Sequence, residues 1–233
     1  MIAPFIFILG LLVGSFVNVL IDRLPMGESV LWGRSHCDYC KKTLRWYELI
    51  PVVSFLLSGG RCRRCRKKLS YQYPVIELVT AVGFVLLLPY HISLYLLFVS
   101  LLVILVADFR YQMIPDSMIV LGCIGAVWHG MHLISALCSF ACFFLLWLLT
   151  KKKGMGFGDV KFAFFMGLFL GFPGVVIAVY LAFLTGAIVG VILILSRKKT
   201  LKSAIAFGPF LVGGTVVAFL WQPQWIALLR MFV

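Results

Sequence analysis

The chain has 233 residues, of which 63% are hydrophobic and only 12% are charged. Soluble domains are roughly 45–50% apolar and about 25% charged, so a soluble domain of this length could not cover itself with so few polar side chains. The formal net charge is +13, from 21 basic and 8 acidic residues. Because the apolar runs are continuous and a spanning helix needs ~20 mostly apolar residues, we predict an all-α polytopic membrane protein with about eight transmembrane helices.

The apolar runs place these spans along the chain. The first, Ile2–Ile21, lacks the basic N-terminal region and the small-residue cleavage site of a signal peptide. The run Val160–Phe172 is short for a transmembrane helix. It is counted as a span because, without it, the basic stretch Arg197–Lys202 would fall on the opposite side of the membrane from the other basic segments. The remaining predicted spans are Pro74–Tyr90, Ile92–Ala107, Ser117–Met131, Leu133–Thr150, Val175–Leu195 and Ala204–Leu220.

The basic residues are distributed unequally between the two sides that these spans define. All but one of the 21 lie in segments on one side, namely 22–73, Arg110, Lys151–Lys153, Lys161 and the stretch 197–202. Only Arg230 falls on the other side. The positive-inside rule therefore places both termini outside and the loop 22–73 in the cytoplasm. The charge excess is explained by orientation and by contact with anionic membrane lipids, and no nucleic-acid partner is expected.

The polar loop 22–73 contains two Cys-x-x-Cys pairs, with 21 residues between Cys40 and Cys62. This spacing is typical of a structural zinc site with Cys37, Cys40, Cys62 and Cys65 as ligands. His36 could replace one ligand. The alternative is four unrelated or redox-active cysteines, although disulfides are disfavoured in a reducing cytoplasm.

Two acids, Asp108 and Asp159, fall at the cytoplasmic ends of predicted spans, where ionisable residues are costly and usually functional. Two carboxylates that share a proton leave one charged and one neutral, as aspartic proteolysis requires. Gly156 and Gly158 remove side-chain bulk beside Asp159. In the alternative interpretation, Asp108 pairs with Arg110 and Asp159 is a helix N-cap.

The other acids within or next to spans have simpler interpretations. Asp116 follows a proline and precedes a span, so it is expected to cap a helix, although it remains the main rival for a catalytic role. Glu77 is expected in the first turn of the second span, or facing the site. Asn18 is expected to bond across helices. His129 and His132 are three residues apart, a spacing that could suit a metal.

A series of short motifs follows in order along most of the chain. They are Gly14–Val19, Arg23–Pro25, Arg34–Cys40, Glu48–Ser54, Gly60–Cys65, Tyr73–Glu77, Asp108, Ile114–Asp116 and Gly156–Lys161. In this series the chain resembles the type 4 prepilin leader peptidases, which are membrane aspartic peptidases and N-methyltransferases. One departure is Asp38, where many relatives have proline.

The resemblance implies that Asp108 and Asp159 are catalytic, supported by Gly156, Gly158, Lys161 and Asp116. The implied substrate is a prepilin or pseudopilin, cut after a glycine at the cytoplasmic face of the bacterial inner membrane. S-adenosylmethionine would then methylate the new N-terminus. Glu48 and Glu77 are loose candidates for that cofactor. The implied division is a first transmembrane helix (1–21), the zinc module, which is the possible methyltransferase part (22–73), and the peptidase domain (74–233).

Four alternatives remain open from the sequence. The chain could be a peptidase without methyltransferase activity, because some relatives lack one activity. It could be an ion-coupled transporter that uses its acids as proton relays. It could also be a zinc-bearing membrane scaffold, or another membrane peptidase of the Gly-x-Gly-Asp type. No oligomeric state is predicted.

Overall fold

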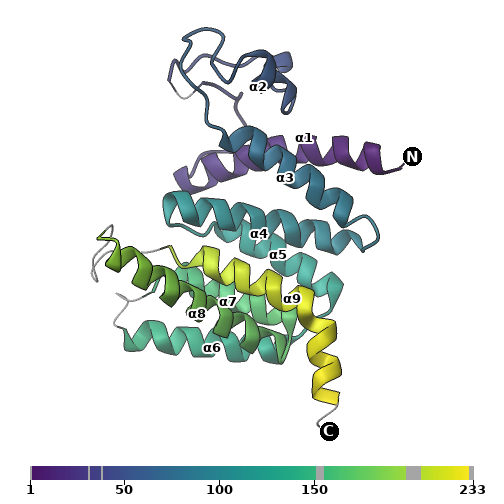
Figure 1. Cartoon of the computed structure of the whole chain (residues 1–233), viewed down its shortest axis with the longest axis vertical. Helices are drawn as coiled ribbons and strands as arrows, with labels where there is room; N and C mark the ends of the chain where they lie inside the picture. The colour runs from purple at the N-terminus through teal and green to yellow at the C-terminus, as the bar shows by residue number, and fades with distance from the viewer. Residues whose placement is uncertain (1, 31, 38, 151–154, 198–205, 231–233) are drawn as a thin grey trace. The chain divides into compact units, whose positions relative to one another are not determined.

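The computed structural model describes the chain except residues 1, 31, 38, 151–154, 198–205 and 231–233, and gives the backbone alone for residues 223–230. The described part is helical, with β-type pairing limited to two isolated bridges (Figure 1). The predicted features that lie outside the described residues are Asp38, Lys151–Lys153, Lys198, Lys199, Lys202 and the predicted start of the last span at Ala204. The α-helices are α1 (Ile2–Arg23), α2 (Val53–Leu57), α3 (Gln72–Leu86), α4 (Ile92–Tyr111), α5 (Asp116–His129), α6 (Leu133–Leu149), α7 (Phe157–Leu170), α8 (Gly174–Leu195) and α9 (Gly208–Arg230).

Each of the eight predicted spans coincides with one of these helices, and α2 is the helix that was not predicted. Three segments are long and apolar enough to cross a bilayer, namely Ile2–Met26, Ile92–Tyr111 and Gly174–Leu195. The other apolar helices are shorter. The described residues therefore establish an all-helical protein with three clear apolar spans.

Several predicted boundaries need correction where charged residues stand, among them those next to the two predicted acids. Helix α4 continues past Ala107 to Tyr111, and α7 begins at Phe157 instead of Val160. Hydropathy falls at the first charged side chain, whereas backbone hydrogen bonding continues until the chain turns. At the end of α4 this turn is Gln112, which has a φ of 53° and donates its N–H to the carbonyl of Asp108. Both predicted acids therefore lie inside helices.

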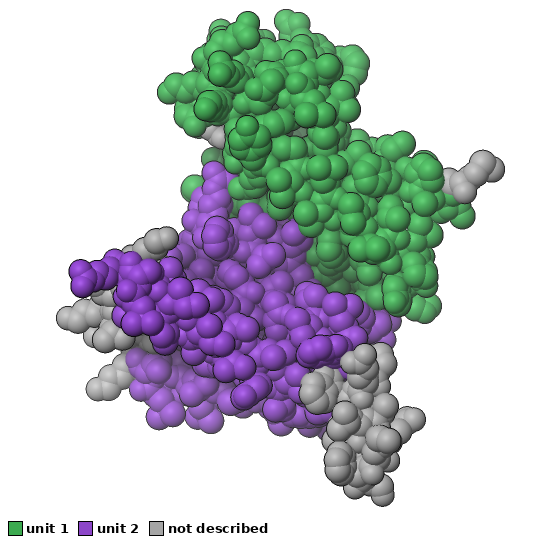
Figure 2. Space-filling model, in the orientation of Figure 1, with its two compact units in different colours: residues 1–99 green, residues 100–233 purple. Residues whose placement is uncertain are grey.

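The chain divides into two compact units, residues 1–99 and residues 100–233, with the boundary inside α4 (Figure 2). In the first unit, α1 packs against α3. A Cβ on Gly10 would lie 2.6 Å from Cα of Ala81, and a Cβ on Gly14 would lie 2.7 Å from Cα of Glu77. The two glycines, four residues apart on one face, thus allow the helix backbones to approach closely.

Asn18 adds a polar contact between the same two helices. Its Nδ2 donates to the carbonyl oxygen of Tyr73 at 3.1 Å, as predicted for a bond across helices. Tyr73 in turn donates its hydroxyl to Asp22, the penultimate residue of α1, at 3.2 Å. The end of α1 and the start of α3 are therefore tied together where the polar loop leaves and re-enters the helical pair.

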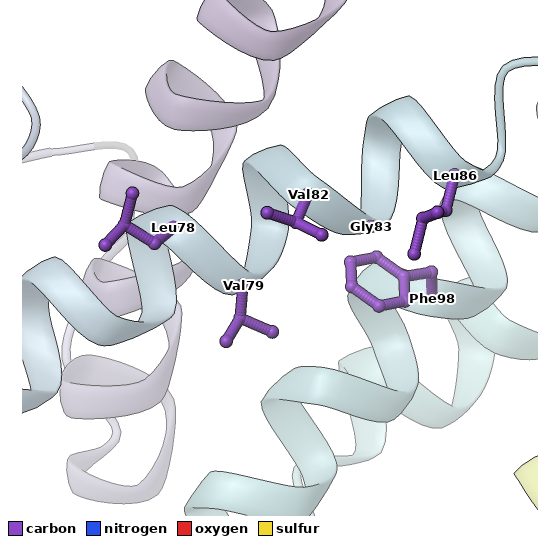
Figure 3. A pocket seen from close by; sticks show the side chains of 6 residues that line it. All are labelled: Leu78, Val79, Val82, Gly83, Leu86 and Phe98. Carbon is purple, nitrogen blue, oxygen red and sulfur yellow. The ribbon is translucent and has the colours of Figure 1, made fainter.

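A shallow hollow of about 370 Å³ lies on the surface of the first unit (Figure 3). Helix α3 supplies most of its wall, and the ring of Phe98 from α4 packs against Gly83. Every side chain that lines it is apolar, so it offers no hydrogen bonds to a polar cofactor. The lining residues are Leu78, Val79, Val82, Gly83, Leu86 and Phe98.

In the second unit α7 is the central helix. It contacts α5, α6, α8 and α9, and ten of its 14 residues are buried. The hydroxyl of Ser139 on α6 donates to the carbonyl of Ala163 on α7 at 2.8 Å, and Gly167 leaves space for Ser139 at the same contact. Packing on all sides fixes α7, and with it the position of Asp159 near its start.

Candidate active site

Asp108 lies in the last turn of α4 with 6% of its surface exposed. Its Oδ2 accepts a hydrogen bond of 2.8 Å from the backbone N–H of Gly208, the first residue of α9. A Cβ at position 208 would lie 2.6 Å from this oxygen, so only glycine fits against the carboxylate. Burying a carboxylate without a hydrogen-bond partner costs much free energy, and the backbone amide at the start of α9 supplies that partner to Asp108.

Asp159 is the third residue of α7 and is 8% exposed. Its Oδ2 accepts the backbone N–H of Gly156, the N-cap residue, at 3.2 Å. The interpretation of Asp159 as an N-cap is therefore wrong: it occupies the third helical position and reaches back to the cap. This contact satisfies one of the backbone N–H groups at the start of the helix and anchors the carboxylate in the first turn.

The two carboxylates lie close enough to interact electrostatically. They come from different helices of the second unit, and each is held at Oδ2 by a backbone amide from a glycine. Two buried acids that interact electrostatically cannot both ionise at little cost, so such a pair favours holding one proton between them. The arrangement can therefore hold one carboxyl group charged and the other neutral.

Asp116 has a different environment from this pair. Pro115 is the N-cap of α5, and Asp116 is the first helical residue with no side-chain cap bond, so the predicted N-capping role is wrong. Instead, both of its carboxylate oxygens lie 2.7 Å from Nζ of Lys161 on α7. Asp116 is 68% exposed, which makes this a surface ion pair. The pair links the start of α5 to the first turns of α7.

The two glycines beside Asp159 have separate structural roles. A Cβ on Gly156 would lie 3.5 Å from Oδ2 of Asp159, so this glycine borders the carboxylate. A Cβ on Gly158 would instead lie 3.2 Å from Cβ of Ile114, in the segment before α5. Gly158 therefore allows the start of α7 to pack on that segment.

Gly208 is the site residue that the sequence argument missed. It contributes a backbone group, 100 positions from its partner Asp108, and a search based on acidic side chains does not detect such a donor. The available signal was the Gly208-Pro209 pair at the start of the last apolar run, which marks a helix start.

The four predicted cysteine ligands form one cluster in the first unit. Their sulfur atoms all lie within 4.8 Å of one another, and Sγ of Cys37 is 3.9 Å from Sγ of Cys65. A tetrahedral metal with bonds of about 2.3 Å sets its sulfur ligands about 3.8 Å apart, so the cluster can hold a metal ion. His36 is not in the cluster, and its ring nitrogen instead contacts the carbonyl of Arg34.

The two Cys-x-x-Cys segments fold as matching turns. In the first turn, the N–H of Lys41 donates to the carbonyl of Cys37, and the N–H of Cys37 donates to the carbonyl of Lys42. In the second turn, the N–H of Arg66 donates to the carbonyl of Cys62, and the N–H of Cys62 donates to the carbonyl of Lys67. Lys41 and Arg66 both have a positive φ, 54° and 59°.

Backbone N–H groups of Cys65 and Arg64 lower the pKa of the Cys62 thiol, whereas burial raises that of Cys37. Of these two thiols, Cys62 therefore supplies a thiolate more readily than Cys37.

The two acids considered for a methyl donor both accept backbone hydrogen bonds within the first unit. Glu48 accepts the N–H of Arg45 at 2.7 Å and closes a short 3₁₀ turn, Trp46–Glu48. Glu77 is buried and accepts the N–H of Val52 at 2.7 Å. Glu77 is the sixth residue of α3, so its predicted place in the first turn is wrong: the helix begins earlier, at Gln72. Glu48 therefore stabilises a turn, and Glu77 holds the backbone at Val52.

The histidines predicted as a possible metal pair are not in a metal cluster among the described residues. The ring of His129 packs against Phe169 and Phe219. His132 donates its backbone N–H to Leu168, and its ring lies beside Gly171. Both histidines therefore pack against α7 or the residue that follows it.

Two family models match adjacent parts of the chain. The Bacterial Peptidase A24 N-terminal domain matches residues 8–91, and the Type IV leader peptidase family matches residues 95–191. The second match contains both Asp108 and Asp159. The chain belongs to the type IV leader peptidase family.

Curated relatives agree with this assignment. A "Prepilin leader peptidase/N-methyltransferase" from Bacillus subtilis is 32% identical over 232 residues, covering 93% of each chain. Proteins of the same name from Pseudomonas aeruginosa and Myxococcus xanthus are 30% and 34% identical, covering 93% and 84% of this chain and 89% and 64% of their own. No solved structure matches the chain significantly.

Proposed function

We propose that the protein is a prepilin leader peptidase that also methylates the new N-terminus of its product. Family membership and the names of its curated relatives support both activities. The observation that carries the peptidase assignment is the pair of buried acids, Asp108 and Asp159, which interact electrostatically from two helices of the matched region. A transporter is less favoured because both acids lie at helix ends and not at mid-helix.

Cleavage would follow the aspartic mechanism. The charged carboxylate takes a proton from a water molecule, whose oxygen attacks the scissile carbonyl carbon, while the neutral carboxyl group gives its proton to the carbonyl oxygen. The tetrahedral intermediate then loses its C–N bond, and the amine leaves with a proton returned from the pair. Backbone amides of Gly156 and Gly208 would keep each Oδ2 in place, so the water and carbonyl meet oxygens of fixed position.

We infer a membrane arrangement of eight spans, with the active site at the cytoplasmic face of the bacterial inner membrane and both termini outside. Asp108 lies in the last turn of α4 and Asp159 in the first turn of α7, so both would lie at the same side of the bilayer. The bias of basic residues supports that side as the cytoplasm. The substrates would be prepilins or pseudopilins cut after a glycine, where the basic leader meets the apolar pilin helix.

We assign a structural zinc to Cys37, Cys40, Cys62 and Cys65, within a cytoplasmic module of residues 22–73. The size of the sulfur cluster and its four-cysteine composition support zinc, and bound zinc would hold the two turns together. Residues 1–21 and 74–233 would form the first transmembrane helix and the peptidase domain. Methyl transfer from S-adenosylmethionine would involve the module. Glu48 and Glu77 would act there by shaping the backbone.

The experiment that tests both activities is mass spectrometry of a purified prepilin after incubation with the pure protein and S-adenosylmethionine. We expect the leader to be lost after a glycine and one methyl group to appear on the new N-terminal residue. Loss of the leader without methylation would leave the peptidase assignment alone. An unchanged substrate, with protein that is folded and contains zinc, would overturn both.

A further inference from the structure

The short helix α2 presents an apolar face that the rest of the described protein does not cover. Leu56 and Leu57 are 69% and 74% exposed, and Val53, one turn earlier, is also exposed. The other side of the helix is packed, since the ring of Phe55 lies 5.5 Å from the ring of Tyr71. The segment therefore contacts the rest of the first unit on one side and is apolar on the other.

A contact with α3 fixes the position of this apolar face along the axis of α3. Val52 immediately precedes α2 and donates its N–H to Glu77 at 2.7 Å. Glu77 is the sixth residue of α3, which places it about 7.5 Å along the axis from the first residue. Hence α2 does not project beyond the end of α3 but lies beside its first turns. In the membrane arrangement proposed above, those turns would cross the headgroup region.

The sequence around this face is strongly basic. The chain contains no acidic residue between Glu48 and Glu77. The second cysteine turn directly follows α2, and its cations are exposed. These cations are Arg61, Arg63, Arg64, Arg66, Lys67 and Lys68. An exposed apolar face next to clustered cations is the pattern that binds the interface of an anionic bilayer.

We propose that α2 is an interfacial anchor: Val53, Leu56 and Leu57 insert among the acyl chains, while the cations of the second cysteine turn contact anionic lipid headgroups. The anchor holds the cysteine module flat against the bilayer beside α3. A lipid surface fits better than the apolar helix of a substrate, because the basic leader of a prepilin would be repelled by the same cations. The anchor does not depend on the proposed peptidase activity.

Photocrosslinking in the full-length protein tests this anchor. Leu57→p-benzoylphenylalanine places a C–H-reactive group on the apolar face of α2. Tyr39→p-benzoylphenylalanine is the control for depth, because Tyr39 is also exposed but its ring lies against Nζ of Lys67, a cation proposed to contact the headgroups and not the acyl chains. Both variants are reconstituted in nanodiscs of either phosphatidylglycerol or phosphatidylcholine, irradiated, and digested for mass spectrometry of the labelled peptide.

We expect the probe at position 57 to yield phospholipid adducts severalfold more often than the probe at position 39. We also expect adducts to be severalfold more frequent in phosphatidylglycerol, with this preference reduced in the background Arg64→Gln/Lys68→Gln. Absence of lipid adducts at position 57, or equal adducts at both positions, would overturn the proposal. So would capture of added prepilin in place of lipid, whether or not the protein cleaves it.

Discussion

The contact between Gly208 and Asp108 yields a prediction that depends on a single methyl group. In Gly208→Ala, the new Cβ would lie 2.6 Å from Oδ2 of Asp108, 2.9 Å from Cγ and 3.0 Å from Cβ. The whole carboxyl group must therefore move, by about 0.4 Å or more, and the 2.8 Å hydrogen bond is lost or lengthened. Hydrogen bonds to charged groups contribute about 1.5–3 kcal/mol, so we expect prepilin cleavage to slow by about ten- to hundredfold.

The matched control is Gly213→Ala on the same helix, where a Cβ would meet nothing within 4 Å. We expect this variant to cleave at the normal rate. The assay is the initial rate of leader removal in detergent, followed on a gel, with methyl transfer to pre-cleaved pilin as a measure of folding. Normal cleavage by a folded Gly208→Ala variant would refute the role of this amide in holding Asp108.

Three further predictions concern other contacts. Asp116→Asn and Lys161→Met each remove the same surface ion pair, so we expect the free energy of unfolding to fall by less than about 1 kcal/mol. We expect both variants to cleave prepilin within tenfold of the normal rate. Loss of cleavage by Asp116→Asn would make Asp116 catalytic. Cys62→Ser should lose bound zinc by elemental analysis, whereas Cys138→Ser, which lies outside the cluster, should retain it; equal zinc in both would exclude the cluster as the site. Gly14→Ala places a Cβ 2.7 Å from a backbone atom of α3, so we expect the free energy of unfolding to fall by about 1–3 kcal/mol in a thermal unfolding assay. An unchanged melting temperature would show that α1 and α3 can move apart without cost.

Much of the fold and of the candidate site could be predicted because the signals are local. Continuous apolar runs predicted the helices. The two Cys-x-x-Cys pairs predicted a cluster that the structure confirms as able to hold a metal ion. The acids were easy to single out because a chain with only eight of them can place few at helix ends. The structure buries Asp108 and Asp159 near the ends of two helices, where they interact electrostatically, and their catalytic role stays a prediction.

The parts that could not be predicted depend on contacts between distant segments. Lys161 pairs with Asp116 across 45 positions, which converted an expected helix cap into an ion pair. Val52 reaches Glu77 across 25 positions, so an acid expected to interact with its own helix dipole instead holds a loop. The Gly208 amide is invisible to any argument based on side chains. Tertiary packing decides the partner in each case, and residue type and spacing do not specify it.

The central claim is that Asp108 and Asp159 together carry out the cleavage. The most direct test is the initial rate of prepilin cleavage by Asp108→Asn and by Asp159→Asn, measured alongside methyl transfer to pre-cleaved pilin. The shared-proton mechanism predicts that each variant loses cleavage, because an amide can neither accept a proton from water nor complete the proton exchange, while methyl transfer persists. Cleavage at the normal rate by either variant would contradict it.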